Sequence, residues 1–231
     1  DMFGSSPKTV MTDSTKHHKY KAVKTDAAKL NEYIETVLQI EGVACKDWLT
    51  NKVDRSVTGK IARQQCQGEI QLPLSDCGVV ALDYTGNSGI ATSIGHAPQA
   101  GLIDPAAGSV LSITEALTNI VGANLNGGLK AVSLSANWMW PCRNEGEDAG
   151  LYRAVKACSD FACDLGINIP TGKDSLSMTQ KYGNKKVIAP GTVIISAGGE
   201  VCDVKKTVSP VLQQKKSRLY YIDFSGCDMQ L

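Results

Sequence analysis

Two polar side chains in the middle of the chain, Glu115 and Asn119, are the first candidates for binding chemistry. They lie four residues apart in the stretch 104–124, whose apolar residues recur at helical spacing and predict one amphipathic helix. Residues four apart on a helix lie one above the other. A carboxylate and an amide oxygen so placed suit a hard cation such as Mg²⁺, which takes oxygen ligands. Two ordinary solvated helix residues would show the same spacing, and on spacing alone that interpretation is the more common one.

The predicted helix also has an apolar stripe that we expect to be buried. This stripe consists of Val110, Ile113, Leu117, Ile120 and Val121.

A third candidate ligand, Asp76, belongs to the stretch 70–84, which predicts a strand with a buried apolar run. An acidic residue in a buried strand is costly unless it is paired or bound to a metal ion. Asp76 is therefore a second source of a carboxylate for a cation. A strand-edge aspartate that makes a turn explains the local pattern equally well.

Two further stretches carry groups that could bind a phosphate. Residues 54–59 (DRSVTG) have the pattern of a turn and offer an arginine and hydroxyl groups. Residues 170–175 (PTGKDS) invite a phosphate-loop interpretation, but Asp174 stands where that motif requires Ser or Thr. Gly172, Lys173 and Ser175 could still bind a phosphate in another geometry.

Composition narrows the class of protein. The chain has 231 residues, of which 42% are apolar and 20% charged, as in globular proteins. A net charge of +1 disfavours nucleic-acid binding. No apolar run approaches the roughly 18 residues of a membrane helix, so we expect a cytoplasmic protein. The eight cysteines form no C-x-x-C pair and are predicted to be reduced.

The order of predicted elements indicates an α/β or α+β fold, in which helices pack on a mixed sheet. A polar leader occupies 1–24. Helices are predicted at 26–40 with Thr25 as N-cap, at 104–124 and from 144 to 166. Strands are predicted at 46–53, 70–84, 129–137, 167–169, 192–201 and 218–224, and 86–101 is expected to be a long glycine-rich loop with a strand within it. The last residues, 225–231, have no closing signal, which is expected where a linker to another domain begins.

Six stretches together resemble the phosphoribosylformylglycinamidine synthase family. They are DRSVTG (54–59), LSDCGVVALD (74–83), TEALTN (114–119), LSANWM (134–139), GEDAGLY (146–152) and GKDSLSM (172–178). The resemblance extends from about Met2 to Phe224. The large, glutamine-dependent form of this family has two halves that each resemble aminoimidazole ribonucleotide synthase, plus a glutaminase domain. The resemblance implies that 25–224 is the amino-terminal subdomain of the second half.

The resemblance also implies a reaction and partners. The parent enzyme would convert formylglycinamide ribonucleotide to its amidine, with ATP as energy source and glutamine as nitrogen donor. The sheet would pack against a sister subdomain, with the glutaminase domain elsewhere in the enzyme. In an isolated fragment that surface would be exposed or covered by a homodimer, and the fragment would lack the overall reaction.

A ligand set follows from the resemblance as well. The second half of these enzymes carries ADP or ATP with magnesium ions. The matching metal ligands would be Asp76, Glu115 and Asn119, and the matching residues near the nucleotide would be Lys46 and Ser75. Two interpretations stay open: the subdomain takes part in the ATP chemistry, or it is a scaffold whose nucleotide only stabilises the interface with the sister domain.

Overall fold

The computed structural model describes residues 10, 14, 21 and 23–222, and a six-stranded mixed sheet forms the centre of this part of the chain. Its strands, in spatial order, are β1 (Ile61–Arg63), β2 (Cys77–Ala81), β3 (Gly89–His96), β8 (Thr192–Val201), β4 (Ser133–Met139) and β5 (Asn168–Ser175). Neighbouring strands are antiparallel except β4 and β5, which are parallel. The predicted fold class, a mixed sheet packed with helices, is confirmed.

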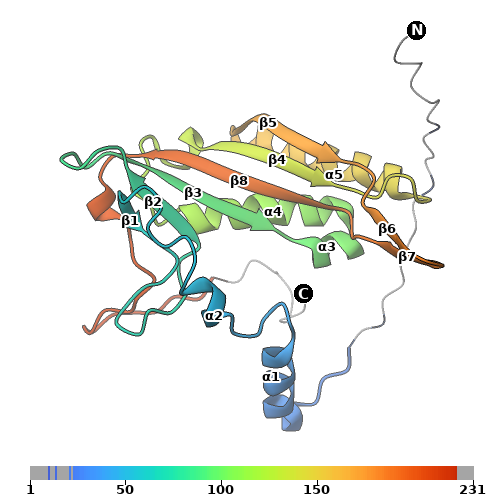
Figure 1. Cartoon of the computed structure of the whole chain (residues 1–231), viewed down its shortest axis with the longest axis horizontal. Helices are drawn as coiled ribbons and strands as arrows, with labels where there is room; N and C mark the ends of the chain where they lie inside the picture. Colours follow the sequence, from blue (N-terminus) through green and yellow to red (C-terminus); the bar gives the residue numbers. More distant parts are fainter. Residues whose placement is uncertain (1–9, 11–13, 15–20, 22, 223–231) are drawn as a thin grey trace.

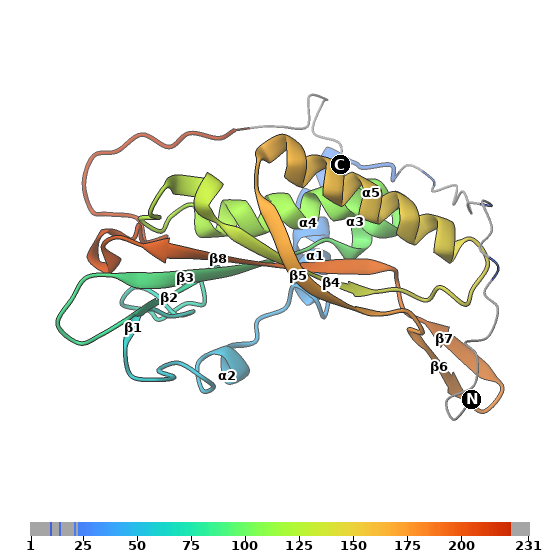
Figure 2. The ribbon, with the colours of Figure 1, turned by 90° about the horizontal axis from the view of Figure 1, so that it is seen from above.

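Three helices cover one face of this sheet, as Figure 1 and Figure 2 show from two directions. They are α3 (Pro98–Ile103), α4 (Pro105–Ile120) and α5 (Glu147–Leu165). The core lies between these helices and the sheet, and its largest fully buried side chains include Ile113, Ile120, Leu134 and Ile195. The opposite face of the sheet is open over β3, where Ile90 and Ile94 are 47% and 58% exposed.

Smaller elements complete the described part of the chain. Strands β6 (Thr179–Tyr182) and β7 (Lys185–Ile188) form a separate hairpin at one end of the molecule (Figure 1). The short helices are η1 (Ala27–Lys29), α1 (Leu30–Gln39), α2 (Asp47–Thr50), η2 (Gly128–Ala131) and η3 (Val204–Lys206). No helix among the described residues combines the length and apolarity that crossing a membrane requires.

The two elements with the strongest periodicity in the sequence have bounds close to the predicted ones. Strand β8 has the predicted bounds, and its residues alternate between the buried core side and the open side. Helix α5 falls within the predicted range, buries Ala154, Cys158 and Ala162 at helical spacing, and ends at Gly166. Gly166 has a φ of +67°, the left-handed conformation that glycine supplies at a helix end.

Strand β3 confirms the strand expected within 86–101, but the expectation of a long loop is wrong. β3 takes eight residues at the centre of the sheet, and α3 follows almost at once. Its core side carries only small residues, Gly89, Ala91, Ser93 and Gly95. Helix α4 crosses so closely that a Cβ on Gly95 would lie 1.9 Å from the Ser112 carbonyl oxygen. The strand therefore lacks the large inward residues by which strands are recognised.

The N-terminal region differs from the prediction in three ways. The helix predicted at 26–40 forms as η1 and α1, and Asp26 rather than Thr25 caps it, by accepting a hydrogen bond from Ala28 N–H. None of the residues of α1 is buried, although Leu30, Tyr33, Ile34, Val37 and Leu38 form an apolar stripe along it. The strand predicted at 46–53 is wrong, because that segment forms α2 and has no neighbouring strand to pair with.

The remaining differences concern strand boundaries. The strand predicted at 70–84 begins only at Cys77 and ends at Ala81. The strand predicted at 129–137 begins only at Ser133, because η2 occupies the preceding residues. Residues 170–175 are not a loop but part of β5. The predicted last strand is wrong for 218–222, where side chains such as Tyr221 are exposed and no strand is assigned. Most of the predicted leader, and all of 225–231, lie outside the described residues, so the predicted domain boundaries stay predictions.

The seven described cysteines are all free thiols, as predicted. Cys227 lies outside the described residues.

Candidate functional site

A cavity of about 810 Å³ lies where β2 and β3 meet the polar side of α4. Four of the five residues predicted to form a site line it: Ser75, Asp76, Glu115 and Asn119. Ser75 and Asp76 directly precede β2, whereas Glu115 and Asn119 lie on α4. These side chains are separated by about forty residues in sequence, and the packing of α4 against β3 brings them to one cavity.

Helix α4 holds its two polar residues against the end of β3. The backbone N–H of His96 donates a hydrogen bond to the Glu115 carboxylate. The Asn119 side-chain nitrogen donates to the Ile94 carbonyl oxygen at 3.0 Å. This second bond turns the amide nitrogen toward the strand and leaves the amide oxygen on the other side. Burial of Ile113, Leu117 and Ile120 on the opposite side of α4 fixes the position of both residues.

Asp76 differs from the prediction in its surroundings. It is exposed and stands outside the strand, so the argument from a costly buried carboxylate does not apply to it. Among the described residues, none donates a hydrogen bond to the Asp76 carboxylate or forms an ion pair with it. Next to it, the Ser75 hydroxyl donates to the Cys77 carbonyl oxygen at 3.1 Å. Asp76 and Asn119 also line a smaller adjoining cavity of about 230 Å³.

Two arginines bring positive charge to the large cavity. Arg55 donates from Nε to the Gln64 side chain at 2.8 Å, and its guanidinium also donates to Gln71. Arg63 donates to the Thr207 carbonyl oxygen at 3.1 Å. Burial lowers the pKa of Arg63 from its usual value, although a guanidinium still keeps its charge at neutral pH. Arg55 belongs to a segment proposed for phosphate contact, whereas no local motif distinguished Arg63.

The cysteine in this cavity is held in its neutral form. Burial raises the pKa of the Cys77 thiol, and this outweighs the opposite effect of the nearby Arg63 charge. Cys77 therefore presents a thiol rather than a thiolate at neutral pH. The ligands available for a cation here are oxygen atoms.

A family model described as the FGAR-AT PurM_N-like domain matches residues 45–200, which is more than half of the chain. This chain belongs to that family. It is 43% identical over 198 residues to the phosphoribosylformylglycinamidine synthase of Homo sapiens, and 44% identical over 184 residues to that of Drosophila melanogaster. The alignments cover 85% and 80% of this chain but only 15% and 14% of these relatives.

Solved structures agree on the fold of this FGAR-AT PurM_N-like domain. "T. maritima PurL complexed with ATP" superposes with a TM-score of 0.53 at 14% identity, covering 89% of this chain and 29% of that one. "Structure of PurLQS from Thermotoga maritima" gives a TM-score of 0.53 at 17% identity, covering 71% and 25%. At such low identity the likeness shows the fold alone.

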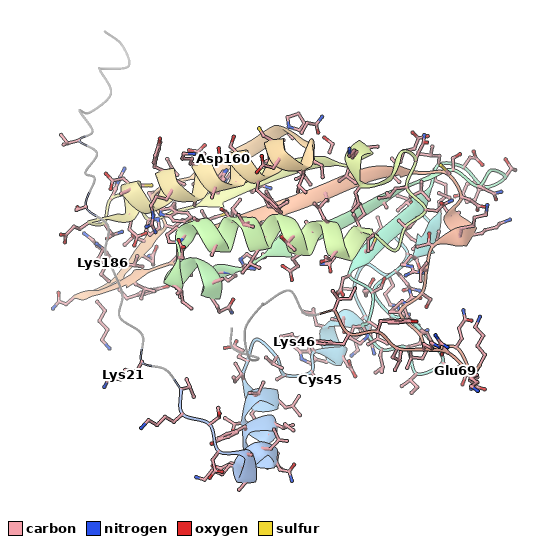
Figure 3. The ribbon with its side chains drawn as sticks, turned by 180° about the vertical axis from the view of Figure 1, so that it is seen from behind. Lys21, Cys45, Lys46, Glu69, Asp160 and Lys186 are labelled. Carbon is pink, nitrogen blue, oxygen red and sulfur yellow. The ribbon has the colours of Figure 1, made fainter. Side chains whose placement is uncertain are left out.

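Two of the predicted binding groups lie apart from the large cavity of this family domain. Lys46 lies beside α2 (Figure 3), and its ammonium group donates to the carbonyl oxygens of Glu41 at 2.7 Å and Ala44 at 2.9 Å. Lys173, in the segment proposed for a phosphate, contacts Ser175 Oγ at 2.6 Å on β5. Strand β5 is the sheet edge opposite β1, so this segment is far from Asp76 in the strand order.

The cavity side chains fit a magnesium ion in chemical type. Asp76, Glu115 and Asn119 offer two carboxylates and an amide oxygen, which are hard ligands that Mg²⁺ prefers. Among the described residues, no three His, Cys, Asp or Glu side chains gather in a group able to hold a metal ion. A cation here would thus depend on Asn119 and on oxygens from a nucleotide or water, since Mg²⁺ commonly combines one or two carboxylates with phosphates and water.

Proposed function

We propose that this chain is part of a cytoplasmic phosphoribosylformylglycinamidine synthase, and that its role there is to bind a magnesium nucleotide. The complete enzyme would convert formylglycinamide ribonucleotide to formylglycinamidine ribonucleotide, with ATP as energy source and glutamine as nitrogen donor. Membership of the FGAR-AT PurM_N-like family and the two named relatives support this assignment. Because the chain spans 14–15% of those relatives, other parts of the same enzyme would supply the rest of the reaction.

The observation that carries the proposal is that Ser75, Asp76, Glu115 and Asn119 line one cavity of about 810 Å³. That volume lies within the range of about 300–1,000 Å³ typical of small-molecule sites. T. maritima PurL, which shares the fold, has been solved with ATP and with ADP. A bound magnesium ion would supply positive charge against a polyphosphate.

Each residue has a proposed role. The carboxylates of Asp76 and Glu115 and the amide oxygen of Asn119 would face the cation. Ser75 would face the nucleotide from the wall of the cavity. Lys46 lies outside the cavity, so it would contact the nucleotide only by exchanging its two carbonyl partners for phosphate oxygens that extend beyond the cavity. The two cavity arginines, Arg55 and Arg63, already provide charge complementary to phosphate.

The alternative proposal is a structural one, in which the nucleotide stabilises the contact with the sister half of the enzyme. The open face of the sheet supports an interface of some kind, because Ile90 and Ile94 of β3 are largely exposed there. Exposed apolar patches of this type mark interaction surfaces. In the isolated chain the same face could instead pair with a second copy, which sedimentation or light scattering would detect.

Thermal unfolding in the presence of Mg-ATP tests whether the cavity binds nucleotide. A ligand at one hundred times its Kd stabilises the folded state by about 2.7 kcal/mol, so the midpoint should rise with ligand concentration. We expect Asp76→Ala to remove most of this rise. Asp164→Ala, at an exposed position of α5 outside the cavity, should keep it. An unchanged midpoint for the unaltered chain, or an undiminished rise in Asp76→Ala, would count against the proposal.

Replacing Glu115 by alanine in the complete enzyme separates the catalytic from the structural role. If the site takes part in ATP chemistry, kcat should fall while assembly and thermal midpoint are retained. If the site is a scaffold, the variant should lose assembly or folding together with activity. Size-exclusion chromatography and steady-state kinetics on the same preparation distinguish these outcomes.

A further inference from the structure

The cavity proposed for the nucleotide adjoins the smaller cavity of about 230 Å³. Five residues line both of them: Arg63, Ser75, Asp76, Cys77 and Asn119. Val208, Ser209 and Pro210 line only the smaller one. They belong to the segment 207–211, here called the strap, which follows η3 and contains neither helix nor strand. The strap passes beside the loop between β1 and β2 (Figure 1), where a Cβ on Gly68 would lie 3.2 Å from a Val211 methyl group.

Two hydrogen bonds join the strap to the structure around it. Arg63 donates to the Thr207 carbonyl oxygen at 3.1 Å, and Val208 N–H donates to the Gly122 carbonyl oxygen, just beyond α4, at 2.8 Å. Val208 is 68% exposed, and the buried Thr207 hydroxyl has no hydrogen-bond partner among the described residues. Docking of the strap is therefore weak, because it buries little apolar surface and leaves a polar group unpaired.

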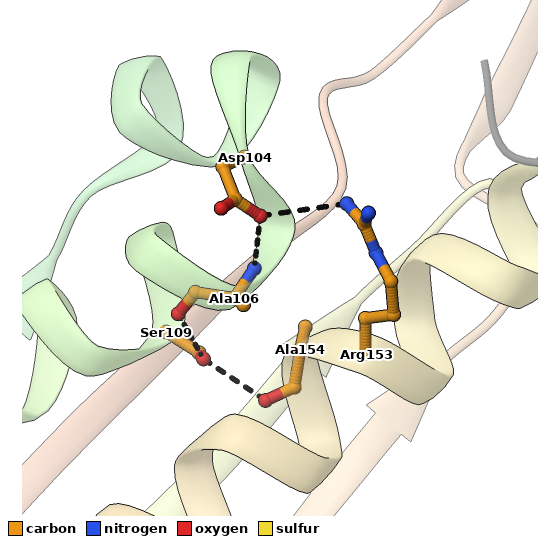
Figure 4. A network of polar contacts seen from close by, with 5 residues as sticks. All are labelled: Asp104, Ala106, Ser109, Arg153 and Ala154. Carbon is orange, nitrogen blue, oxygen red and sulfur yellow. Dashed lines mark hydrogen bonds and ion pairs between the residues drawn. The ribbon is translucent and has the colours of Figure 1, made fainter. Parts of the chain in front are cut away.

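Helix α4, which contributes Asn119 to both cavities, is held more firmly than the strap. Its apolar side is packed into the core beneath the sheet. At its start, the Ser109 hydroxyl lies 2.9 Å from the carbonyl oxygens of both Ala106 and Ala154, the second of which belongs to α5 (Figure 4). The smaller cavity thus has one firmly packed wall and one weakly docked wall, and opening it requires only the strap to move.

Arg63 links the strap to the proposed nucleotide site, because it lines both cavities and donates to Thr207. A guanidinium carries five N–H donors in a planar fork, so Arg63 can keep this bond and donate to a phosphate oxygen at the same time. A polyphosphate in the large cavity would hold the guanidinium in place. The bond to Thr207 would then cost less conformational entropy, so nucleotide binding and strap docking would favour each other.

We propose that the strap closes one side of the nucleotide site, and that bound nucleotide keeps it docked through Arg63. This inference rests on the proposed function, since it requires a nucleotide in the large cavity. Coupling between two binding events is reciprocal, so a docked strap tightens nucleotide binding by the same factor by which nucleotide stabilises docking. The strap therefore regulates how firmly the site retains its nucleotide, whether that nucleotide takes part in chemistry or stabilises an interface.

Amide hydrogen exchange of the ¹⁵N-labelled 231-residue chain, followed by NMR with and without saturating Mg-ATP, tests this coupling. The reporter is Val208 N–H, whose exchange requires the strap to undock from Gly122. We expect Mg-ATP to slow its exchange by about fivefold or more, as typical couplings between sites do. The reference is Asn126 N–H, which donates to the Glu200 carbonyl oxygen at 2.8 Å outside both cavities. Its exchange should change by less than about twofold, because it opens independently of the strap.

The thermal midpoint of the same sample separates failure of the coupling from failure of the proposed function. If Mg-ATP raises the midpoint while Val208 exchange stays the same or becomes faster, the coupling is overturned and the nucleotide site stands. If Mg-ATP changes neither quantity, both are overturned. Slowing at Asn126 equal to that at Val208 would indicate general stabilisation, and it would also overturn the coupling.

A pair of substitutions in the strap tests the reciprocal effect on nucleotide affinity. Val208→Pro removes the N–H donor, and Thr207 before it already has the extended backbone that a following proline favours. This variant should weaken Mg-ATP binding by about fivefold or more in a calorimetric titration. Val208→Ala keeps the N–H and should bind like the unaltered chain. Equal affinity of the two variants would overturn the proposal.

A pair of arginine substitutions tests the route of the coupling. Arg63→Lys keeps the positive charge but lacks the fork that donates in two directions, so saturating Mg-ATP should slow Val208 exchange by less than about twofold. Arg55→Lys is the matched control, because Arg55 lines the large cavity but donates to Gln64 and Gln71. It should keep the full slowing. Full slowing in Arg63→Lys, or its loss in Arg55→Lys alone, would overturn the assignment to Arg63.

Discussion

Helices α4 and α1 both carry an apolar stripe at helical spacing. Within the described residues, α4 packs apolar residues into the core, whereas α1 buries none. Helix α4 packs Ile113 and Ile120 fully into the core beneath the sheet. Helix α1 buries no residue, and Ile34 and Leu38 are 48% and 54% exposed. In Figure 1, α1 stands away from the sheet and the helices that cover it.

This difference teaches what an amphipathic pattern does and does not establish. The pattern predicts which side of a helix favours burial, but not which surface will bury it. The difference between the two helices also affects the residues of the candidate site. Glu115 and Asn119 have defined positions because α4 is fixed against β3. The ammonium group of Lys46, which follows α1, instead donates to backbone carbonyl oxygens close to it in sequence.

The largest expected effect comes from truncating the same residue type on each helix. Ile113→Ala should destabilise the protein by about 2–5 kcal/mol, because it removes a fully buried side chain and leaves a cavity. Ile34→Ala should change the free energy of unfolding by less than about 0.5 kcal/mol. Urea denaturation followed by circular dichroism measures both. A comparable loss in both variants would show that α1 is packed in solution.

A pair of glycine substitutions tests how closely α4 lies to the sheet. Gly95→Ala should cost about 1–3 kcal/mol or more, since the added Cβ would overlap the backbone of α4. Gly42→Ala, just beyond α1, meets no atom within 4 Å and should be neutral or stabilising by up to about 1 kcal/mol. The same denaturation measurement applies. A neutral Gly95→Ala would contradict the close contact of α4 and β3.

The helix caps offer a smaller contrast. Asp104 accepts a hydrogen bond from Ala106 N–H at the start of α4, and Asp26 accepts one from Ala28 N–H just before α1. Asp104→Ala should lower global stability by about 1 kcal/mol. Asp26→Ala should reduce helical ellipticity slightly and leave the unfolding midpoint unchanged. Equal shifts of the midpoint would indicate that both helices unfold with the core.

The smallest expected effect is a pH dependence. Burial raises the pKa of Cys158 on α5 to about 11, from a usual value of 9.0. Above pH 9 the unfolded thiol loses its proton while the folded one keeps it, so stability falls as pH rises. Cys158→Ala should show a shallower fall between pH 8 and 9.5. The exposed Cys45→Ala keeps Cys158 and should retain the original slope, and identical slopes in all three proteins would contradict this assignment.

Prediction from sequence succeeded where local periodicity and burial agree. Helix α5 and strand β8 bury alternate or helically spaced residues, and both were predicted with nearly correct bounds. Strand β3 inverts the usual pattern, because close packing of α4 demands small residues inside while Ile90 and Ile94 face the open side. Composition alone therefore favoured a loop.

The candidate site was only partly accessible from sequence. The spacing of Glu115 and Asn119 indicated a shared side of a helix, and both line the large cavity. That Asp76 lines the same cavity depends on the order of β2, β3 and α4 in space, which no local pattern specifies. Arg63 was missed for the same reason, since it reaches the cavity from the edge strand β1.

Paramagnetic broadening by Mn-ATP gives the most direct test of the proposed cation site, because Mn²⁺ accepts the same oxygen ligands as Mg²⁺. If Asp76, Glu115 and Asn119 surround the ion, substoichiometric Mn-ATP should broaden the Asn119 side-chain amide resonances first. The indole resonance of Trp140, which lines a different cavity beside the start of α4, should stay sharp. Preferential broadening of the Trp140 signal, or saturable Mn-ATP binding that leaves Asn119 unaffected, would contradict the assignment.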